Sequence, residues 1–337
     1  MDSWKDVLKT DLTSWLLEKE NPSVRYFTLV DVCGKSKDDP EVCQASQEIM
    51  GTGIVPQILA KQNKGGFWEE AENLYAKAKY KGTVWQLIIL AELGADRNDE
   101  RIQAACEFVL QMSQDRASGG FAYRGSAKGG GFPSGVLPCL TGNMIWSLIK
   151  LGYADDPRVK RGVEWISTFQ RVDDGEGEKP TGWPYDKRNV CWGSHTCHLG
   201  VVKAMKAVAE IPEEKRDEKV KGIIDKGSEY LLRHHLFKRS HDLERVAKAK
   251  WLKLGFPSMW DTDVLEMLLI LTKLGIKDER MQEGIELVLS KQDQSGRWIL
   301  ENTYNGRFQV NIERKNKSSK WITLNALRVL KKNFYLA

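Results

Sequence analysis

The residue types best suited to chemistry gather in a few short stretches, and the first of these is acidic. Asp261 and Asp263 stand two residues apart, with Glu266 three residues further along. Carboxylates this close can share a proton or bind a divalent cation, and apolar surroundings raise a carboxyl pKa enough to make a general acid. The alternative is structural, with Asp261 capping a helix beside Thr262. We take Asp261 and Asp263 as candidate catalytic residues.

A second stretch combines imidazole and thiol side chains. His195 and Cys197 lie next to His198 and shortly after Cys191. Such a mixture suits zinc, and His195 could also serve as a base. The alternative is that Cys197 and His198 are ordinary core residues. The metal would be zinc or magnesium, and its predicted ligands are Cys139, His195, Cys197 and Asp261.

A third stretch is basic and rich in glycine. Arg124 and Lys128 lie among Gly125 and the run 129–131, and Lys81 could join them from a neighbouring segment. Cations beside exposed backbone N–H groups suit a phosphate or diphosphate, against the alternative of a solvated loop. No strand precedes these glycines, so they do not form a nucleotide-binding motif. The predicted substrate-binding cations are Lys81, Arg124 and Lys128.

Tryptophans adjoin the two reactive stretches. Trp192 precedes the His–Cys stretch and Trp260 precedes Asp261. An indole ring in a cavity can stabilise a carbocation, although most tryptophans serve core packing. We therefore add Trp192 and Trp260 to the predicted substrate-binding residues.

Composition limits the classes of protein to consider. The chain has 337 residues, a net charge of +5 and six cysteines. The mild charge allows anionic ligands or peripheral contact with a membrane surface but does not favour nucleic acid. No stretch is apolar enough for a membrane span, and so few cysteines favour reduced thiols. We expect a cytoplasmic protein.

The elements that position these residues repeat about every 60 residues. Acidic turns supply an Asp or Asn where a helix should begin, and Leu–Gly pairs such as 93–94, 151–152 and 274–275 end the preceding helix. Each repeat is therefore a helical hairpin. The acidic turns lie at residues 38–42, 98–102, 155–159, 216–220 and 277–281.

A threonine near the start of each first helix allows the hairpins to be counted. With an extra helix over about Trp4–Glu18 packing beside the last helix, six hairpins would close into an all-α (α/α)6 toroid, one domain over 1–337. Gly–aromatic steps at 65–68, 119–121, 182–183 and 296–298 would lie at the same end as the threonines. That end is the expected active face. The threonines are Thr28, Thr83, Thr141, Thr196, Thr262 and Thr323.

Several of these segments resemble known families. The run 291–298, Lys-Gln-Asp-Gln-Ser-Gly-Arg-Trp, resembles the Gln–Trp repeat of squalene and hopene cyclases, and 257–262 is similar to their Pro-x-x-Trp-Asp-Thr segment. The run 194–199 resembles the helix start that supplies the zinc histidine of protein prenyltransferase β subunits. The run 119–124 with Lys128 resembles their Gly-Gly-Phe-x-x-Arg loop, which holds the isoprenoid diphosphate. The resemblance implies an α/α toroid.

The same resemblance also has gaps. Where prenyltransferases have Asp-x-Cys, this chain has Leu140-Thr141-Gly142, and where cyclases have Asp-x-Asp-Asp it has Asp261-Thr262-Asp263-Val264. The resemblance implies an isoprenoid-handling enzyme, cyclase-like or prenyltransferase-like, whose ligand is an isoprenoid or its diphosphate. Two alternatives stay open: a non-catalytic binding or scaffold protein, and a glycan-acting enzyme with paired carboxylates.

Overall fold

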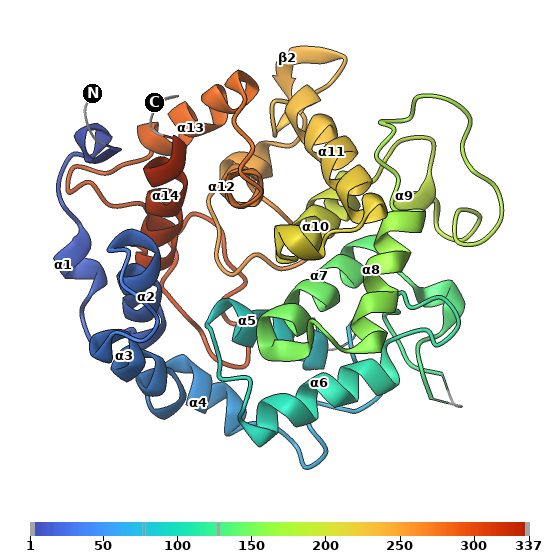
Figure 1. Cartoon of the computed structure of the whole chain (residues 1–337), viewed down its shortest axis with the longest axis horizontal. Coiled ribbons are helices and arrows are strands. Elements are labelled where there is room, and N and C mark those ends of the chain that lie inside the picture. The colour runs from blue at the N-terminus through green and yellow to red at the C-terminus, as the bar shows by residue number, and fades with distance from the viewer. Residues whose placement is uncertain (1–3, 76, 78, 127–128, 334–337) are drawn as a thin grey trace. The chain divides into compact units, whose positions relative to one another are not determined.

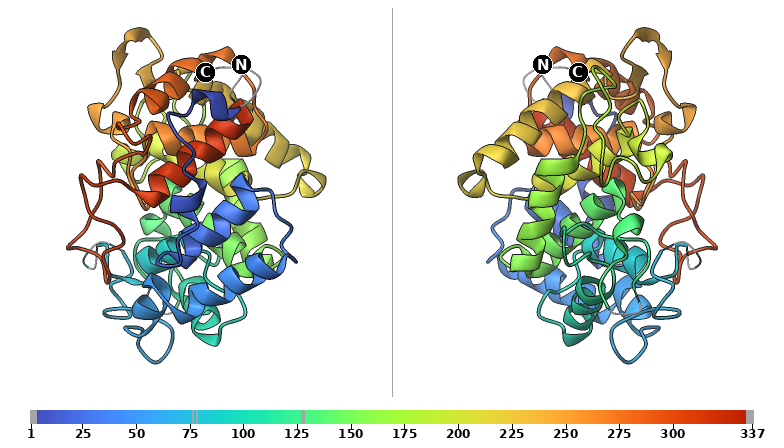
Figure 2. Two further views of the ribbon diagram at one scale, coloured as in Figure 1. Left: turned by 90° about the vertical axis from the view of Figure 1, so that its left-hand side faces the viewer. Right: turned by 90° about the vertical axis from the view of Figure 1, so that its right-hand side faces the viewer.

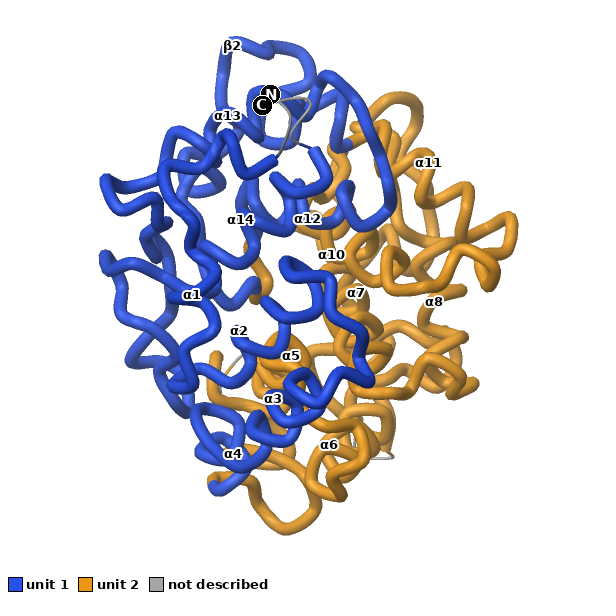
Figure 3. The backbone as a smooth tube through the Cα atoms, turned by 60° about the vertical axis from the view of Figure 1, so that its left-hand side comes forward, with its two compact units in different colours: residues 1–60, 231–258, 262–337 blue, residues 61–230, 259–261 orange. Residues whose placement is uncertain are grey.

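The computed structural model describes residues 4–75, 77, 79–126 and 129–333 as two compact units, coloured in Figure 3. Unit 1 comprises residues 1–60, 231–258 and 262–337, and unit 2 comprises 61–230 and 259–261. Helices dominate both, so the all-α class is confirmed (Figure 1). Closure into one ring and the single domain over 1–337 depend on how the units are placed, and both stay predictions.

Unit 2 contains helices of two kinds. In α5, α7 and α10 nearly every residue is buried, whereas α6, α8 and α11 bury one face only. This difference is expected when an inner helix is covered all round and an outer helix covers it from one side. The bounds are α5 (Thr83–Glu92), α6 (Glu100–Met112), η3 (Pro133–Gly135), α7 (Pro138–Leu148), η4 (Ile149–Tyr153), α8 (Pro157–Phe169), α9 (Asn189–Trp192), α10 (His198–Val208), η5 (Glu213–Lys215) and α11 (Glu218–Arg233), whose last residues belong to unit 1.

Unit 1 has the same alternation and adds a short antiparallel β-hairpin, β1 (Lys238–Arg239) with β2 (Asp242–Val246). No helix in the described part of the chain is long and apolar enough to cross a membrane. The helices are η1 (Trp4–Val7), α1 (Thr13–Leu16), α2 (Pro22–Phe27), η2 (Thr28–Val32), α3 (Pro40–Gly51), α4 (Ile54–Leu59), η6 (Ala249–Leu252), α12 (Val264–Lys273), η7 (Glu279–Met281), α13 (Gln282–Ser290) and α14 (Lys320–Asn333).

The acidic turns begin the outer helices as predicted. Asp39, Asp99, Asp156 and Asp278 each accept a hydrogen bond from the backbone N–H two residues on, at 2.7–2.9 Å. Asp217 accepts one from Val220 N–H. The glycines of the predicted helix ends, at 94, 152 and 275, have positive φ values. A side chain at such a φ would be strained, so these endings depend on glycine.

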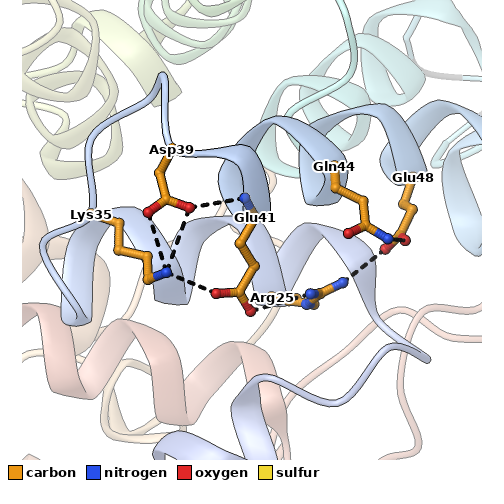
Figure 4. Close-up of polar contacts among 6 residues, drawn as sticks. All are labelled: Arg25, Lys35, Asp39, Glu41, Gln44 and Glu48. Carbon is orange, nitrogen blue, oxygen red and sulfur yellow. Dashed lines mark hydrogen bonds and ion pairs between the residues drawn. The ribbon is translucent and has the colours of Figure 1, made fainter.

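The first acidic turn also ties an inner helix to its outer neighbour (Figure 4). Arg25 of α2, whose side chain is 8% exposed, donates to Glu41 at 3.2 Å and to Glu48 at 3.1 Å, both on α3. Lys35 donates to Glu41 and to the capping carboxylate of Asp39. A buried guanidinium with two carboxylates is well compensated for its loss of water.

Three of the predicted threonines hold a Gly–aromatic step. The hydroxyl oxygens of Thr83, Thr141 and Thr323 accept hydrogen bonds from the backbone N–H of Trp68, Phe121 and Trp298, at 2.9–3.2 Å. Each of these aromatic side chains is fully buried. We call this contact the threonine–aromatic bond. It fixes the loop that arrives from an outer helix onto the start of the next inner helix.

The rest of each step fastens the loop to the following outer helix. Gln62 and Gln114, which precede the glycines, donate to the carbonyls of Arg101 in α6 and Arg158 in α8. The glycines press on the same helices: a Cβ at Gly66 would lie 2.4 Å from the carbonyl of Ala104, and one at Gly119 would lie 2.7 Å from that of Arg161. One step therefore joins three helices.

The amino-terminal segment fills the corresponding place in the last repeat, beside α14 (Figure 2). Gln292 donates to the carbonyl of Val7, a Cβ at Gly296 would lie 2.8 Å from the side chain of Thr10, and Lys320 of α14 pairs with Glu18. The predicted packing beside the last helix is confirmed. The predicted continuous helix Trp4–Glu18 is wrong, because η1 and α1 are separate.

Replacing Thr141 with Val tests the threonine–aromatic bond. Thr141 is fully buried, and its hydroxyl also donates to the carbonyl of Leu137. Thr141→Val keeps the shape of the side chain but leaves the buried Phe121 N–H without its acceptor. We therefore expect the free energy of unfolding, measured by urea titration, to fall by about 1–3 kcal/mol. The exposed Thr168→Val on α8 is the control and should change it by less than about 0.5 kcal/mol. Equal losses in both variants would contradict the assignment.

Candidate functional site

The inner helices of unit 2 run parallel and two of them touch backbone to backbone. A Cβ at Gly142 of α7 would lie 2.4 Å from the carbonyl carbon of Lys203 in α10, and one at Gly200 would lie 3.1 Å from Pro138. Residue numbers rise together on the two helices, so their amino-terminal ends lie side by side. The absence of a side chain at Gly142 is what permits this approach.

A three-residue segment, 259–261, is held in unit 2 by side chains from three places. Asn143 of α7 donates to the carbonyl of Met259 at 3.1 Å, and Lys203 of α10 donates to the carbonyl of Asp261 at 2.7 Å. The indole N–H of Trp260 donates to the hydroxyl of Tyr80, just before α5, at 2.7 Å. Both predicted residues of this segment, Trp260 and Asp261, are therefore fixed in position.

Burial makes these contacts stronger than surface equivalents. Lys203 is completely buried, Asn143 is 2% exposed and Tyr80 is 1% exposed. A buried ammonium group must be compensated by oxygen acceptors, so its bond to the Asp261 carbonyl is costly to break. The Lys79 ammonium lies 4.5 Å from the centre of the Trp260 ring, within range of a cation–π contact. We call Tyr80, Asn143, Lys203, Trp260 and Asp261 the 259–261 site.

Three members of this site were not predicted from the sequence. Lys203 had a signal, because it and Lys206 are charged residues in a mainly apolar helix. Asn143 had a weaker sequence signal, since a polar residue near a helix start is common. Tyr80 had no sequence signal, because its partner lies 180 residues away.

A second polar layer lies nearer the carboxyl-terminal ends of the same helices. Lys206 of α10 pairs with Glu92 of α5 at 2.6 Å and lies 3.9 Å from the ring centre of Trp146 on α7. The Trp146 N–H in turn donates to Glu210. This layer fixes the spacing of all three inner helices without reaching the 259–261 segment.

The predicted thiol ligands lie at the starts of α7 and α10. Burial, with nearby Cys197 and Cys191, raises the pKa of the Cys139 thiol to about 12, so without a metal ion this thiol is protonated at neutral pH. Among the described residues no group of three His, Cys, Asp or Glu side chains could hold a metal ion. The zinc or magnesium set of Cys139, His195, Cys197 and Asp261 stays a prediction.

Gly142 gives the physical reason for the gap in the prenyltransferase pattern. The Asp-x-Cys ligands of that family would correspond to Leu140 and Gly142 here. Leu140 is 1% exposed, and a side chain at Gly142 would strike the backbone of α10. The close helix contact therefore occupies the space in which such ligands would lie.

The segment before α10 carries Trp192, at the end of α9, and His195 in the following loop, and it depends on an ion pair whose arginine is buried. Arg171 donates to Asp173 through two nitrogens, at 2.9 and 3.0 Å, and to the carbonyl of Gly193 at 2.7 Å. Thr196 donates to the same carboxylate at 2.7 Å. His195 is exposed, whereas Trp192 is 1% exposed and packs edge-on against Trp165. The burial of Trp192 favours core packing. The substrate-binding role of Trp192 and the catalytic role of His195 stay predictions.

Asp263 belongs to unit 1 and caps α12. One carboxylate oxygen accepts from Glu266 N–H at 2.9 Å and the other accepts from Gly255 N–H at 2.7 Å. Helix capping was the structural alternative that the sequence offered for Asp261. In the structure Asp263 is the residue that caps the helix. Its role as an acid stays a prediction.

The predicted cations lie on the surface of unit 2. Lys81 and Arg124 are exposed, and Lys128 lies outside the described residues. Arg124 lies three residues after Phe121, whose N–H donates a hydrogen bond to the hydroxyl of Thr141 in α7. The loop that carries Arg124 is therefore fixed near the start of that helix.

A cavity of about 830 Å³ lies between α8 and α11 and is lined by residues such as Val163, Glu164 and Val220. None of the predicted site residues lines it.

Gly142→Ala tests whether the close approach of α7 and α10 positions the site. A methyl group there would overlap the α10 backbone, so we expect a loss of about 1–3 kcal/mol or more in unfolding free energy. Gly222→Ala on α11 is the matched control, because nothing lies within 4 Å of its Cβ position. That control should stabilise the protein by about 0.5–1 kcal/mol. A tolerated Gly142→Ala would contradict the packing.

The Arg171–Asp173 pair predicts a pH dependence. Burial opposes ionisation of Asp173, but Arg171, Thr196 and the Gly175 N–H outweigh it and hold the carboxyl pKa below its ordinary 3.8. A lowered folded-state pKa stabilises the fold above the unfolded pKa and loses this effect as the pH falls through the folded pKa. The difference in melting temperature between wild type and Asp173→Asn should therefore be full at pH 7 and shrink below about pH 4. A difference that does not change with pH would contradict it.

Comparisons with known proteins come from structures alone, since the chain matches no family model and no curated protein. It is similar to the type II terpene cyclase MstE from Scytonema, with a TM-score of 0.43 and 14% identity over 94% of this chain and 89% of that one. For an arginine-to-alanine variant of MstE in complex with its substrate geranylgeranyl dihydroxybenzoate, the TM-score is 0.41 and the identity 14%, over 94% of this chain and 88% of that one. For an aspartate-to-alanine variant with its product merosterolic acid A, the TM-score is 0.31 and the identity 11%, over 87% of this chain and 97% of that one.

Proposed function

We propose that unit 2 binds an isoprenoid at the 259–261 site and that the protein is a terpenoid cyclase-like enzyme. The observation that carries the proposal is the anchoring of Met259–Asp261 by Asn143, Lys203 and Tyr80. This is the segment whose Trp-Asp sequence resembles the cyclases. An indole and a carboxylate held on fixed supports are the groups that a carbocation reaction needs.

The roles of these side chains follow from their chemistry. The Trp260 ring offers a π-face to the apolar chain and to positive charge that develops on it. Asp261 supplies the acid, and Lys203 keeps its backbone in place as a positioning residue. Lys79, which was not predicted from the sequence, is a cation beside Trp260.

A cyclase-like reaction is better supported than a prenyltransferase-like one. The zinc triad of the prenyltransferases needs side chains where this chain has Leu140 and Gly142, and the helix contact at Gly142 leaves no room for one. Arg124 would then hold the diphosphate of the substrate as an anchor, outside the chemical step.

One observation favours the non-catalytic alternative. One carboxylate oxygen of Asp263 caps α12 and the other accepts from Gly255 N–H, so the acid motif of the cyclases is reduced to Asp261. A scaffold protein would keep the Asp263 contacts and bind its ligand without converting it. Product analysis after incubation with geranylgeranyl diphosphate separates the two, since a scaffold returns the substrate unchanged.

Ligand binding tests the proposal at Trp260. Farnesyl and geranylgeranyl diphosphate should each bind the wild type with micromolar affinity, about −8 kcal/mol, measured by calorimetry. Trp260→Leu removes the ring and should weaken binding about tenfold, or ~1.4 kcal/mol. Trp260→Phe keeps an aromatic face and should lose less.

Tyr80→Phe separates the Trp260 ring from its anchor in this experiment. It deletes the hydroxyl that accepts the Trp260 N–H and keeps both rings, so affinity should fall, but by less than in Trp260→Leu. Absence of binding to either diphosphate would rule out the proposal. A Tyr80→Phe loss as large as that of Trp260→Leu would show that the indole acts only through its hydrogen bond.

A further inference from the structure

We propose that Arg188 and Arg124 together form a binding site for an organic diphosphate on unit 2. Arg124 was predicted from the sequence as a substrate-binding cation, and Arg188 was not. The proposal extends the proposed function by assigning the second cation of the diphosphate site, and it rests on that function only for the isoprenoid part of the ligand.

Two guanidinium groups share one aromatic ring. The Cζ atom of Arg188 lies 4.4 Å from the ring centre of Tyr123, and the Cζ atom of Arg124 lies 5.8 Å from the same centre. The two cations therefore cannot lie further apart than the sum of these distances. Arg124 also lies 4.9 Å from the ring centre of Phe132.

Neither guanidinium is neutralised by a carboxylate. In the part of the chain that the structure describes, Arg124 and Arg188 form no ion pair. By contrast, Arg101, Arg158 and Arg280 each pair with the acidic residue that begins their helix. A cation held over a ring keeps its N–H donors available, and the planar fork of Arg matches phosphate oxygens in pairs.

The backbone on both sides is fixed, so the two cations are placed before a ligand arrives. The carbonyl of Arg188 accepts from the N–H groups of Cys191 and Trp192 in the first turn of α9, and Trp192 is buried. The carbonyl of Arg124 accepts from Phe132 N–H at 3.2 Å. Preorganised donors gain affinity because less freedom is lost on binding.

The arrangement favours a diphosphate over a single phosphate or carboxylate. Two separate forks can each take one phosphoryl group, whereas a monophosphate would satisfy one fork and leave the other in water. Both arginines are exposed, so a polyanion reaches them without the cost of burying its charge.

The test is calorimetric titration of the full chain with inorganic pyrophosphate and, separately, with inorganic phosphate. Wild type should bind pyrophosphate at least about tenfold more tightly than phosphate. Arg188→Gln and Arg124→Gln should each weaken pyrophosphate binding about tenfold, and Arg188→Lys should also weaken it because the fork is lost. The exposed neighbour Lys187→Gln is the matched control and should stay within about twofold.

The results that would overturn the proposal are specific. Absence of pyrophosphate binding, equal affinity for phosphate, or a Lys187→Gln loss as large as that of Arg188→Gln would each contradict it. Arg188-dependent binding to phosphatidylserine vesicles without pyrophosphate binding would assign the cations to a lipid headgroup and overturn it too. Farnesol, which has no phosphate, separates this proposal from the function: its binding should depend on Trp260 and not on Arg188.

Discussion

The threonine–aromatic bond is the interaction on which the rest of the fold depends. A buried hydroxyl at the start of an inner helix accepts the N–H of a buried aromatic residue, as at Thr141 and Phe121. The same step presses a glycine and a glutamine amide onto the next outer helix. An N–H left without a partner in that position would cost about 1–3 kcal/mol, so each loop is held in one arrangement. These contacts hold each such loop against the inner helix and the outer helix that follow it.

The 259–261 site inherits its precision from this framework. Thr141 fixes the start of α7, Gly142 brings α7 against α10, and Asn143 then reaches the carbonyl of Met259. Three consecutive residues thus couple loop placement, helix contact and site geometry. The helix contact that excludes the zinc ligands of the prenyltransferases is also the one that brings Lys203 within reach of Asp261.

Local chemistry explains how much could be predicted from the sequence. Helix caps such as Asp156 and positive-φ glycines such as Gly152 depend on neighbouring residues, so the outer helices were predicted well. The segment Trp4–Glu18 was predicted as one helix because its break has a distant partner: Lys9 N–H donates to Gln292. Site partners that depend on tertiary contacts, such as Tyr80 and Arg188, carry no local signal.

Photo-cross-linking tests the central claim, that an isoprenoid lies at the 259–261 site, most directly. The full chain would be irradiated with a diazirine-bearing analogue of geranylgeranyl diphosphate, digested with trypsin and mapped by mass spectrometry. We expect the label on the peptide 254–273, which contains Trp260 and Asp261, and we expect competition by unmodified geranylgeranyl diphosphate. Label confined to peptides of the groove between α8 and α11, or label that no competitor removes, would contradict the account.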